Sequence, residues 1–341
     1  MFDLERLVRK NILSLKPYSS ARDEFSGSEG IFLDANENPF GTLNRYPDPH
    51  QLELKSVISE VKSVPADQIF IGNGSDEVID LLFRIFCNPG ADKALTFSPT
   101  YGMYQVSADI NDIELIQLPL NAEFQIDFQT LKPWLTNENL KLIFVCSPNN
   151  PSGNIVHKIE DILVNFSGIV VVDEAYVDFH SAESWSQKLD QYPNLVVCQT
   201  LSKAWGLAAA RVGIAYSNPK ILTLLNKVKP PYNVSLINQN AAIEALGNVT
   251  EFKKNRIEIL AQKDWLHAQL SELKSVIKIH PSDSNFLLVE VENADKTYGQ
   301  LVDQKIITRN RNKVAAGCIR ITVGSKTENE KLIQALQEIS K

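Results

Sequence analysis

Cysteine and histidine are both scarce in this chain of 341 residues. The four cysteines, Cys87, Cys146, Cys198 and Cys318, are widely separated and form neither a Cys-x-x-Cys pair nor a compact disulfide framework. The five histidines form no His-x-x-x-His motif and no cluster with carboxylates. These absences argue against a metal site, and they predict reduced thiols that are mostly buried.

Long hydrophobic runs are also absent. The amino terminus alternates charged residues such as Asp3, Arg6 and Lys10 with apolar ones, and it has no continuous signal-peptide core. No later segment is long and apolar enough to span a bilayer. We therefore expect a cytoplasmic protein without a membrane partner.

Positively charged residues are in the minority. Lysine and arginine number 34 against 41 aspartates and glutamates, which gives a formal charge of −7 and a pI near 5.4. This balance argues against a polyanion such as nucleic acid as the main partner, although it is compatible with a local basic pocket. The arginines that stand in motifs are therefore more informative than the overall charge.

The alternation of short β-rich runs with helix-like stretches predicts an α/β fold. A chain of this length, with 44% hydrophobic residues, is large enough for about two domains. Such alternation is typical of a mostly parallel sheet covered by helices. The β-rich runs are residues 93–97, 113–118, 141–145, 169–172 and 195–199.

A second, smaller α+β unit is expected in the carboxyl-terminal part. The charged and apolar stretch at 251–273 is expected to be a helix that leads into it. Strands at 286–291 and 319–323 and a final helix at 328–340 should form this unit, with the N-terminal segment packed against it. The predicted domains are thus 40–245 for the large one, and 1–39 together with 246–341 for the small one.

Lys203 and Asp173 are the most informative pair of residues. Asp173 follows the apolar run Val170–Val172, and Lys203 lies in Thr-Leu-Ser-Lys at 200–203. Pyridoxal phosphate requires an amine that binds it covalently and a carboxylate that keeps its pyridine nitrogen protonated. Taken alone, each residue has an ordinary explanation, since most lysines are solvated and an aspartate after a strand is often a helix cap. Together they suggest this cofactor.

A glycine-containing turn at 72–77, Gly-Asn-Gly-Ser-Asp-Glu, precedes apolar residues with helical spacing. The free amides and the positive end of the helix dipole suit a phosphate, although a plain helix N-cap explains the turn about as well. The turn lacks the third glycine of a dinucleotide fingerprint, so a nicotinamide cofactor is not predicted. The hydroxyls of Thr200 and Ser202 and the guanidinium of Arg211 suit the same phosphate dianion.

These segments, in their order, resemble the fold-type I, class II aminotransferases, which use pyridoxal phosphate. The lysine and aspartate segments and Asn-Pro-Ser-Gly at 150–153 mark that superfamily. Asp-Ala-Asn-Glu-Asn-Pro at 34–39 and Arg-Tyr-Pro-Asp-Pro at 45–49 narrow the resemblance to the histidinol-phosphate aminotransferase family. The matches cover nearly the whole chain. Small departures are Ser152, where threonine is more usual, and Ala208–Ala210, where a glycine is frequent.

The resemblance implies an active site between two lobes and at the interface of a homodimer. It implies that Lys203, Asp173 and Tyr176 are catalytic, with Lys203 binding the cofactor and then shuttling a proton. Asn150 and Tyr176 are implied as hydrogen-bond partners of the cofactor's phenolic oxygen, and Tyr101 as the aromatic that stacks on its ring. The residues implied at the cofactor phosphate are Gly74, Ser75, Asp76, Thr200, Ser202, Arg211 and, from the neighbouring subunit, Tyr46.

Arg320 is the main candidate for substrate binding. It lies in the apolar run Cys318–Val323, where an uncompensated charge is costly, so an anion is a natural partner. The resemblance also implies a carboxylate-binding role for Arg320 and a second substrate arginine at Arg309, with Arg311 as a competitor for that place. Further residues implied in the pocket are Tyr18, Asn36 and Tyr232.

The resemblance implies transamination between L-histidinol phosphate and 2-oxoglutarate, giving imidazole-acetol phosphate and glutamate, in histidine biosynthesis. Two alternatives remain, an aromatic amino-acid aminotransferase and a pyridoxal-phosphate-dependent decarboxylase of a phosphorylated amino acid, because both share the cofactor motifs. A non-catalytic cofactor-binding regulator is disfavoured. Such regulators carry a DNA-binding module, whereas only about forty-five residues precede the Arg-Tyr-Pro-Asp-Pro segment, and these contain no basic recognition helix.

Overall fold

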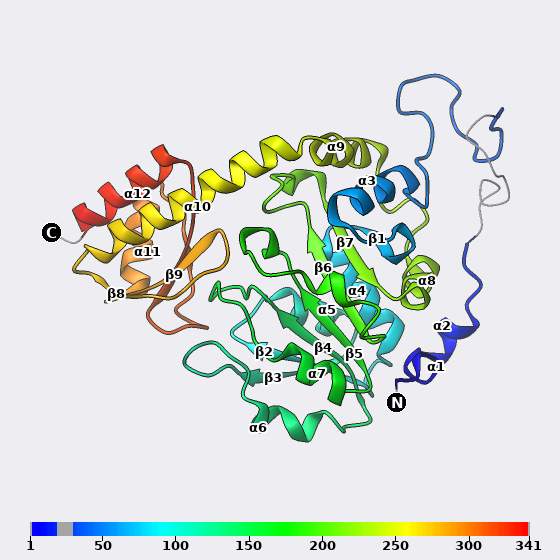
Figure 1. Ribbon diagram of the computed structural model, residues 1–341, viewed down its shortest axis with the longest axis horizontal. Helices are drawn as coiled ribbons and strands as arrows, with labels where there is room; N and C mark the ends of the chain where they lie inside the picture. Colours follow the sequence, from blue (N-terminus) through cyan, green and yellow to red (C-terminus); the bar gives the residue numbers. More distant parts are fainter. Residues whose placement is uncertain (1, 19–29, 340–341) are drawn as a thin grey trace.

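The computed structural model describes residues 2–18 and 30–339, and it divides into a large and a small unit (Figure 1). Each unit is built on its own β-sheet, and the sheets lie side by side beneath one long helix that spans both. The predicted α/β architecture, a large unit with a mostly parallel sheet and a smaller α+β unit, is confirmed.

Within the described residues, seven strands form the large sheet in the order β1-β7-β6-β5-β4-β2-β3. The strands β2 to β6 run parallel, whereas β7 is antiparallel to both β1 and β6. The five predicted runs coincide with five of these strands to within a residue, and β1 and β7 are not among them. The bounds are β1 Ile69–Asn73, β2 Lys93–Ser98, β3 Glu114–Pro119, β4 Leu140–Cys146, β5 Ile169–Asp173, β6 Leu195–Thr200 and β7 Val212–Ser217.

Helices cover both faces of this sheet because its central strands are apolar on both sides. In β5, Val170 and Val172 enter one hydrophobic cluster, while Ile169 and Val171 enter the other. The first cluster includes α3, α7 and α9, and the second includes α4, α5 and α8. The bounds are α3 Leu52–Lys62, α4 Ser75–Phe86, α5 Met103–Ile110, α6 Phe128–Leu131, α7 Ile159–Asn165, α8 Pro219–Val228 and α9 Leu236–Gly247.

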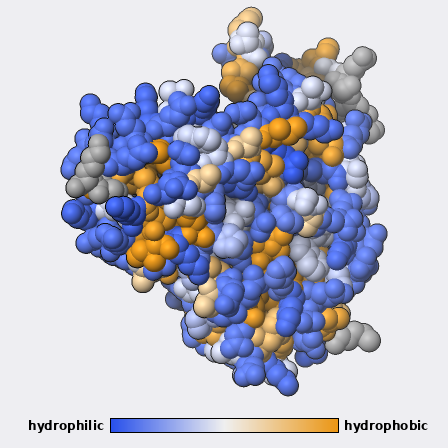
Figure 2. Space-filling model, turned by 60° about the vertical axis from the view of Figure 1, so that its left-hand side comes forward, coloured by the Kyte–Doolittle hydropathy of each residue, from blue (hydrophilic) through white to orange (hydrophobic). Residues whose placement is uncertain are grey.

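The small unit contains an antiparallel sheet with two different faces. In the described part of the chain its order is β10-β11-β9-β8, and α10, α11 and α12 pack on one face over Val289, Ile319 and Ile321. The face of the molecule drawn in Figure 2 is mainly hydrophilic, with hydrophobic patches between the hydrophilic side chains. The bounds are β8 Val276–Ile279, β9 Phe286–Val291, β10 Arg309–Asn310, β11 Cys318–Thr322, α10 Val249–Ser271, α11 Ala294–Asp303 and α12 Lys326–Ile339.

The N-terminal segment was expected to pack against the small unit, and this expectation is wrong for its helices. Helices α1 (Leu4–Leu7) and α2 (Lys10–Ser14) lie on the large unit, where Val8 and Ile12 are buried in the cluster around α4 and α8. The backbone N–H of Arg9 donates to the carbonyl of Ile85, which fixes this packing. Residues 1 and 19–29 of the predicted 1–39 segment, and Ser340 of the predicted last helix, lie outside the described residues.

The boundary predicted at 245–246 falls inside α9, and α10 contributes to the cores of both units. Because α10 is shared in this way, the position of the domain boundary remains a prediction. Short 3-10 helices complete the chain at η2 Ala66–Gln68, η3 Lys132–Trp134, η4 Val177–Phe179, η5 Trp185–Lys188 and η6 Ala208–Ala210. The four cysteines are free and buried, as predicted. Among the described helices, none has both the length and the hydrophobicity that crossing a membrane requires.

Candidate active site

The turn between β1 and α4 is shaped by close approaches that only glycine permits. Gly74 has φ +81°, and a Cβ there would lie 2.5 Å from Nη2 of Arg211. A Cβ on Gly213 of β7 would lie 2.2 Å from the backbone N of Ser75. The first N–H groups of α4 have no carbonyl partner within the helix, and Ser75 and Asp76 line a cavity. This helix end is therefore suited to a phosphate.

Asp76 lines the predicted phosphate site, but its side chain has other partners. Its carboxylate accepts from the hydroxyl of Tyr101 at 3.0 Å and forms an ion pair with Nη2 of Arg211 at 3.3 Å. A carboxylate cannot donate to a phosphate, so only the backbone of Asp76 suits that task. Its side chain instead orients Arg211, whose backbone adopts the left-handed conformation with φ +52°.

Two hydroxyls lie opposite this helix end. The backbone N–H of Ser202 donates to Oγ1 of Thr200 at 3.1 Å, and Oγ1 of Thr200 donates to Oγ of Ser202 at 2.9 Å. Because Thr200 is held by these bonds, its hydroxyl fixes the turn after β6. The proton of the Ser202 hydroxyl remains available to a ligand in the cavity.

Asp173 ends β5 as a buried carboxylate, 3% exposed. It accepts hydrogen bonds from the hydroxyl of Tyr104 at 2.7 Å and from the backbone N–H of Ala175 at 3.1 Å. Burial raises the pKa of its carboxyl group, and these hydrogen bonds oppose that rise only in part. Within residues 2–18 and 30–339 it makes no ion pair. A positively charged nitrogen in the cavity would supply the missing partner.

Lys203 lies in the turn that follows β6, with its Nζ 5.9 Å from the ring centre of Tyr176. Desolvation lowers the pKa of its ammonium group, and the nearby charges of Arg320 and Arg211 lower it further. Asp173 and Asp76 act in the opposite direction. A lowered pKa increases the fraction of neutral amine, which is the form that attacks a carbonyl carbon.

One cavity collects most of the predicted cofactor residues. These are Ser75, Asp76, Tyr101, Asn150, Asp173, Tyr176, Thr200, Ser202, Lys203 and Arg211, joined by Cys146, Ala175 and Ala208, which were not predicted. The group predicted from the sequence fits this set. One cavity holds a buried acid that lacks a cation, a helix end with an arginine beside it, and an amine of lowered pKa.

Arg320 connects this cavity to the small unit. Its Nη1 donates to Oδ1 of Asn150, and its guanidinium lies 5.1 Å from the ring centre of Phe286. Phe286 meets the ring of Tyr176 edge-on at 5.1 Å. In the β10–β11 pair Arg309 lies directly opposite Arg320. A small anion at the mouth of the cavity would therefore meet arginine side chains from two neighbouring strands.

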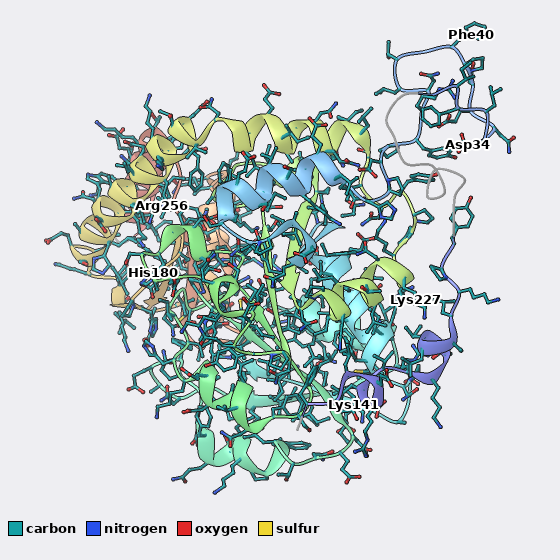
Figure 3. All side chains as sticks on the ribbon, turned by 45° about the vertical axis from the view of Figure 1, so that its right-hand side comes forward. Asp34, Phe40, Lys141, His180, Lys227 and Arg256 are labelled. Atoms are coloured by element: carbon teal, nitrogen blue, oxygen red, sulfur yellow. The ribbon has the colours of Figure 1, made fainter. Side chains whose placement is uncertain are left out.

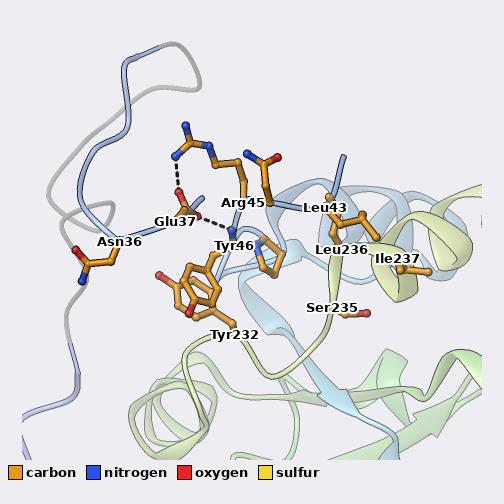
Figure 4. Close-up of a pocket in the computed structure, with 12 residues that line it drawn as sticks. Asn36, Glu37, Leu43, Arg45, Tyr46, Tyr232, Ser235, Leu236 and Ile237 are labelled. Atoms are coloured by element: carbon orange, nitrogen blue, oxygen red, sulfur yellow. Dashed lines mark hydrogen bonds and ion pairs between the residues drawn. The ribbon is translucent and has the colours of Figure 1, made fainter. Parts of the chain in front are cut away.

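Three predicted residues lie elsewhere, in an open pocket formed by the 35–47 segment and the start of α9 (Figure 4). Tyr46 stacks on Tyr232 with ring centres 4.4 Å apart, and Asn36 lines the same pocket. Glu37 accepts from the backbone N–H of Tyr46 at 2.6 Å and forms an ion pair with Arg45. Tyr18, also predicted in the substrate pocket, is 72% exposed and lines neither this pocket nor the cavity.

The segment that carries this pocket projects from the large unit. Asp34 and Phe40 lie on a loop that extends away from both sheets (Figure 3). Ile31, Leu33 and Phe40 are 91%, 88% and 82% exposed. Large hydrophobic side chains are rarely this exposed in one contiguous segment unless another surface covers them.

Comparison with known proteins identifies the family. The family model described as aminotransferase class I and II matches residues 27–336. The chain belongs to the class I and II aminotransferases. A histidinol-phosphate aminotransferase from Cytophaga hutchinsonii is 50% identical over 345 residues, covering 98% of this chain and 99% of that protein.

Two solved structures show the same fold. The histidinol-phosphate aminotransferase of Sinorhizobium meliloti in complex with pyridoxal-5'-phosphate has a TM-score of 0.79 at 24% identity, over 87% of this chain and 83% of that one. The L-threonine-O-3-phosphate decarboxylase of Porphyromonas gingivalis has a TM-score of 0.73 at 22% identity, over 87% and 91%. Aminotransferases and a decarboxylase thus share this architecture.

Sequence reasoning missed one residue near the site of this class I and II aminotransferase and left a second one undecided. Tyr104 donates to Asp173 from α5, and the sequence around it carried no signal for this contact. Arg311 was named only as a competitor of Arg309. In the structure Arg309 is exposed, whereas Arg311 is half-buried and close enough to Tyr176 to influence its phenol.

Proposed function

We propose that this chain is a pyridoxal-phosphate-dependent histidinol-phosphate aminotransferase. It exchanges the amino group between L-histidinol phosphate and 2-oxoglutarate, which gives imidazole-acetol phosphate and glutamate in histidine biosynthesis. The observation that carries the proposal is one cavity lined by Asp173, Lys203 and the start of α4, with Arg320 bonded to Asn150 of its lining. The Cytophaga hutchinsonii relative, half of whose residues are identical, supports the choice of substrate.

Lys203 and Asp173 carry the chemistry. When bound, pyridoxal phosphate supplies an aldehyde that takes up the amino group and a ring that withdraws electrons from the substrate's α-carbon. The neutral Nζ of Lys203 removes the proton from that carbon, and its lowered pKa makes it available as a base. The carboxylate of Asp173, held by Tyr104 and Ala175, keeps a proton on the pyridine nitrogen.

The remaining cavity residues hold the cofactor in place. The amides at the start of α4, the Ser202 hydroxyl and the Arg211 guanidinium bind its phosphate. Tyr101 would pack against its ring, while the Tyr176 hydroxyl and the amide nitrogen of Asn150 would be the donors to its phenolic oxygen. Asn150 can do so because only its oxygen is used by Arg320.

The arginines of the small unit bind the substrate's anion. L-histidinol phosphate has no carboxylate, so its phosphate takes the place that a carboxylate of glutamate occupies in the other half of the cycle. Arg320 and Arg309, directly opposite each other on β11 and β10, meet this group. Burial among Phe286 and Tyr176 raises the strength of a charged hydrogen bond there.

The enzyme acts as a homodimer in the cytoplasm. Tyr46, Asn36 and Tyr232 lie apart from the cavity of their own chain, and the projecting segment exposes Ile31, Leu33 and Phe40. Docking of this segment on a second copy would cover these side chains and bring Tyr46 to the partner's cofactor phosphate. The free, buried cysteines are compatible with the reducing cytoplasm.

A screen of amino donors on the cofactor-loaded protein tests the proposal. L-histidinol phosphate, L-glutamate, L-phenylalanine and O-phospho-L-threonine are each mixed with the protein, and the cofactor's absorbance is followed together with carbon dioxide release. We expect rapid spectral conversion with the first two donors and a kcat/KM at least about tenfold lower with phenylalanine. A preference for phenylalanine would establish the aromatic enzyme instead, and carbon dioxide from the phosphorylated amino acid would establish a decarboxylase.

A further inference from the structure

The sheet of the small unit turns an arginine-bearing face toward the cavity. Arg309 lies opposite Arg320, and the backbone N–H of Arg311 donates to the carbonyl of Cys318 at 3.0 Å, which continues the same ladder by one more pair. Because side chains alternate along a strand, Arg309 and Arg311 lie on the face that carries Arg320. Ile319 lies on the other face, inside the core with α11 and α12.

A single carboxylate holds the residues on both sides of Arg311. Asp295, in the first turn of α11, accepts from Nδ2 of Asn310 at 2.6 Å and from Nδ2 of Asn312 at 2.8 Å. Asn312 in turn accepts from the backbone N–H of Gly317 at 2.9 Å, which closes the loop that follows β10. The two amide donors lower the pKa of Asp295, so it is ionised whenever the enzyme is at neutral pH.

Arg311 has unmet hydrogen-bonding capacity. Its Nε is buried without a partner, and across residues 2–18 and 30–339 its guanidinium makes neither a hydrogen bond nor an ion pair. Nε of Arg320 is likewise buried without a partner. Burial and the positive charge of Arg320 lower the pKa of Arg311, while the phenol of Tyr176 opposes this. Two guanidinium groups on one face of the sheet, near enough to influence each other and each with an unpartnered buried Nε, favour an anion with several acceptor oxygens.

We propose that Arg311 binds the phosphate of the amino substrate beside Arg320, and that Asp295 is a positioning residue that holds Arg311 there through Asn310 and Asn312. The inference rests on the proposed function for the identity of the substrate. It extends that function, since it explains how the enzyme would discriminate phosphorylated from unphosphorylated amines. The discrimination depends on Arg311 and on the hydrogen bonds from Asn310 and Asn312 to Asp295. A phosphate dianion offers more acceptors than a carboxylate, so it gains more from the additional guanidinium.

Calorimetric titration of the cofactor-loaded protein with inorganic phosphate tests the binding step directly, because the cofactor then fills its own phosphate site. We expect Arg311→Gln to weaken phosphate binding about tenfold, Arg311→Lys about threefold, and Asp295→Ala by an amount between the two. Asp303→Ala is the matched control, since Asp303 is an exposed acid at the end of the same helix. It should leave the affinity within about twofold of the native value.

Kinetics with L-histidinol phosphate and L-histidinol, which differ only in the phosphate, test the positioning role. Asp295→Ala should raise KM for the phosphorylated amine several-fold more than KM for the unphosphorylated one, with kcat changed less than KM. A double variant, Asp295→Ala with Arg311→Gln, should bind phosphate as Arg311→Gln alone does, because Asp295 acts through Arg311.

Three results would overturn the inference: phosphate affinity unchanged in Arg311→Gln, additive losses in the double variant, or equal losses for the two amines in Asp295→Ala. Failure of the proposed function looks different. In that case the native enzyme would not prefer L-histidinol phosphate to L-histidinol, while the phosphate titration of the Arg311 variants would still decide whether Arg311 is an anion ligand.

Discussion

The cavity around Lys203 and the open pocket around Tyr46 differ in how completely one chain builds them. In the cavity, polar groups bond to one another: Tyr104 to Asp173, Tyr101 to Asp76, and Asn150 to Arg320. In the pocket, Tyr46 remains 49% exposed, and hydrophobic side chains of the same segment face solvent. The large sheet thus arranges the cavity's polar groups against one another within one chain, whereas the pocket leaves an aromatic pair and several hydrophobic side chains open to solvent.

The largest effect is expected from Lys203→Ala, which removes the reactive amine from the cavity. Loss of this general base should lower kcat by about 10³-fold to 10⁴-fold. In the native protein, borohydride reduction followed by peptide mapping should place the cofactor on the peptide that contains Lys203. The variant, treated in parallel, should carry no such label. Cofactor found on another lysine would show that the cavity is not where the covalent bond forms.

A smaller loss, about 10²-fold in kcat, is expected from Asp173→Asn. Asparagine keeps the shape and can still accept from Tyr104, but it lacks the charge that holds a proton on the pyridine nitrogen. The bound cofactor should remain measurable by absorbance while turnover falls. Tyr104→Phe, which removes the hydrogen bond but keeps the acid, should lose less. Near-native turnover in Asp173→Asn would contradict the proposed role.

Mixing two inactive variants tests whether the two regions meet across a dimer. Tyr46→Phe keeps the stack on Tyr232 but removes the hydroxyl, and Lys203→Ala removes the amine. If Tyr46 serves the partner's cavity, half of the randomly assembled dimers contain one site with both native groups. Activity should then recover to about a quarter of the native level.

The control for this mixture is each parent alone, incubated and diluted in the same way. Subunit exchange is measured independently with two affinity tags. Exchange without recovery, with both parents impaired, would show that the pocket and the cavity are not shared between chains.

The smallest effect concerns stability rather than catalysis. Burial raises the pKa of Asp173 above its value in the unfolded chain, so the folded state binds its proton more readily. The protonated carboxyl group therefore stabilises the folded state at low pH. This contribution to the free energy of unfolding is lost as pH rises from the pKa of the unfolded chain through that of the folded one, and the full destabilisation is present above both pKa values. Cofactor-free Asp173→Asn should lose less stability than the native protein over this rise. Urea midpoints measured across the pH range check this, and parallel curves would contradict it.

The strands of the large sheet could be predicted because apolar runs with polar ends identify buried parallel strands. The strand β7 could not, since Val212–Ser217 follows Arg211 directly without a turn signal, and only pairing with β1 and β6 defines it. Helices α1 and α2 were placed on the wrong unit for a related reason. Their packing depends on Val8 and Ile12, which form no periodic pattern in so short a segment.

The predicted residues of the cavity come from short motifs in which neighbours share a role. Tyr104 acts on Asp173 across 69 positions of sequence, and such a contact leaves no local pattern. For the same reason, the sequence left open whether Arg309 or Arg311 is the second substrate arginine. Alternation along a strand places both on one face, and only the tertiary packing shows that Arg309 is exposed while Arg311 is half-buried.

The long helix α10 has a mechanical consequence. Ile259, near its middle, packs against the cores of both units, so it acts as a fulcrum in a rod of 23 residues. From Ile259 to Ser271 the rod extends about 18 Å, so a tilt of about 5° would displace its far end by about 1.6 Å. That displacement exceeds the tolerance of a hydrogen bond. A small tilt about Ile259 would therefore shift the small-unit residues packed on the far end of α10, such as Leu270, by more than a hydrogen bond tolerates.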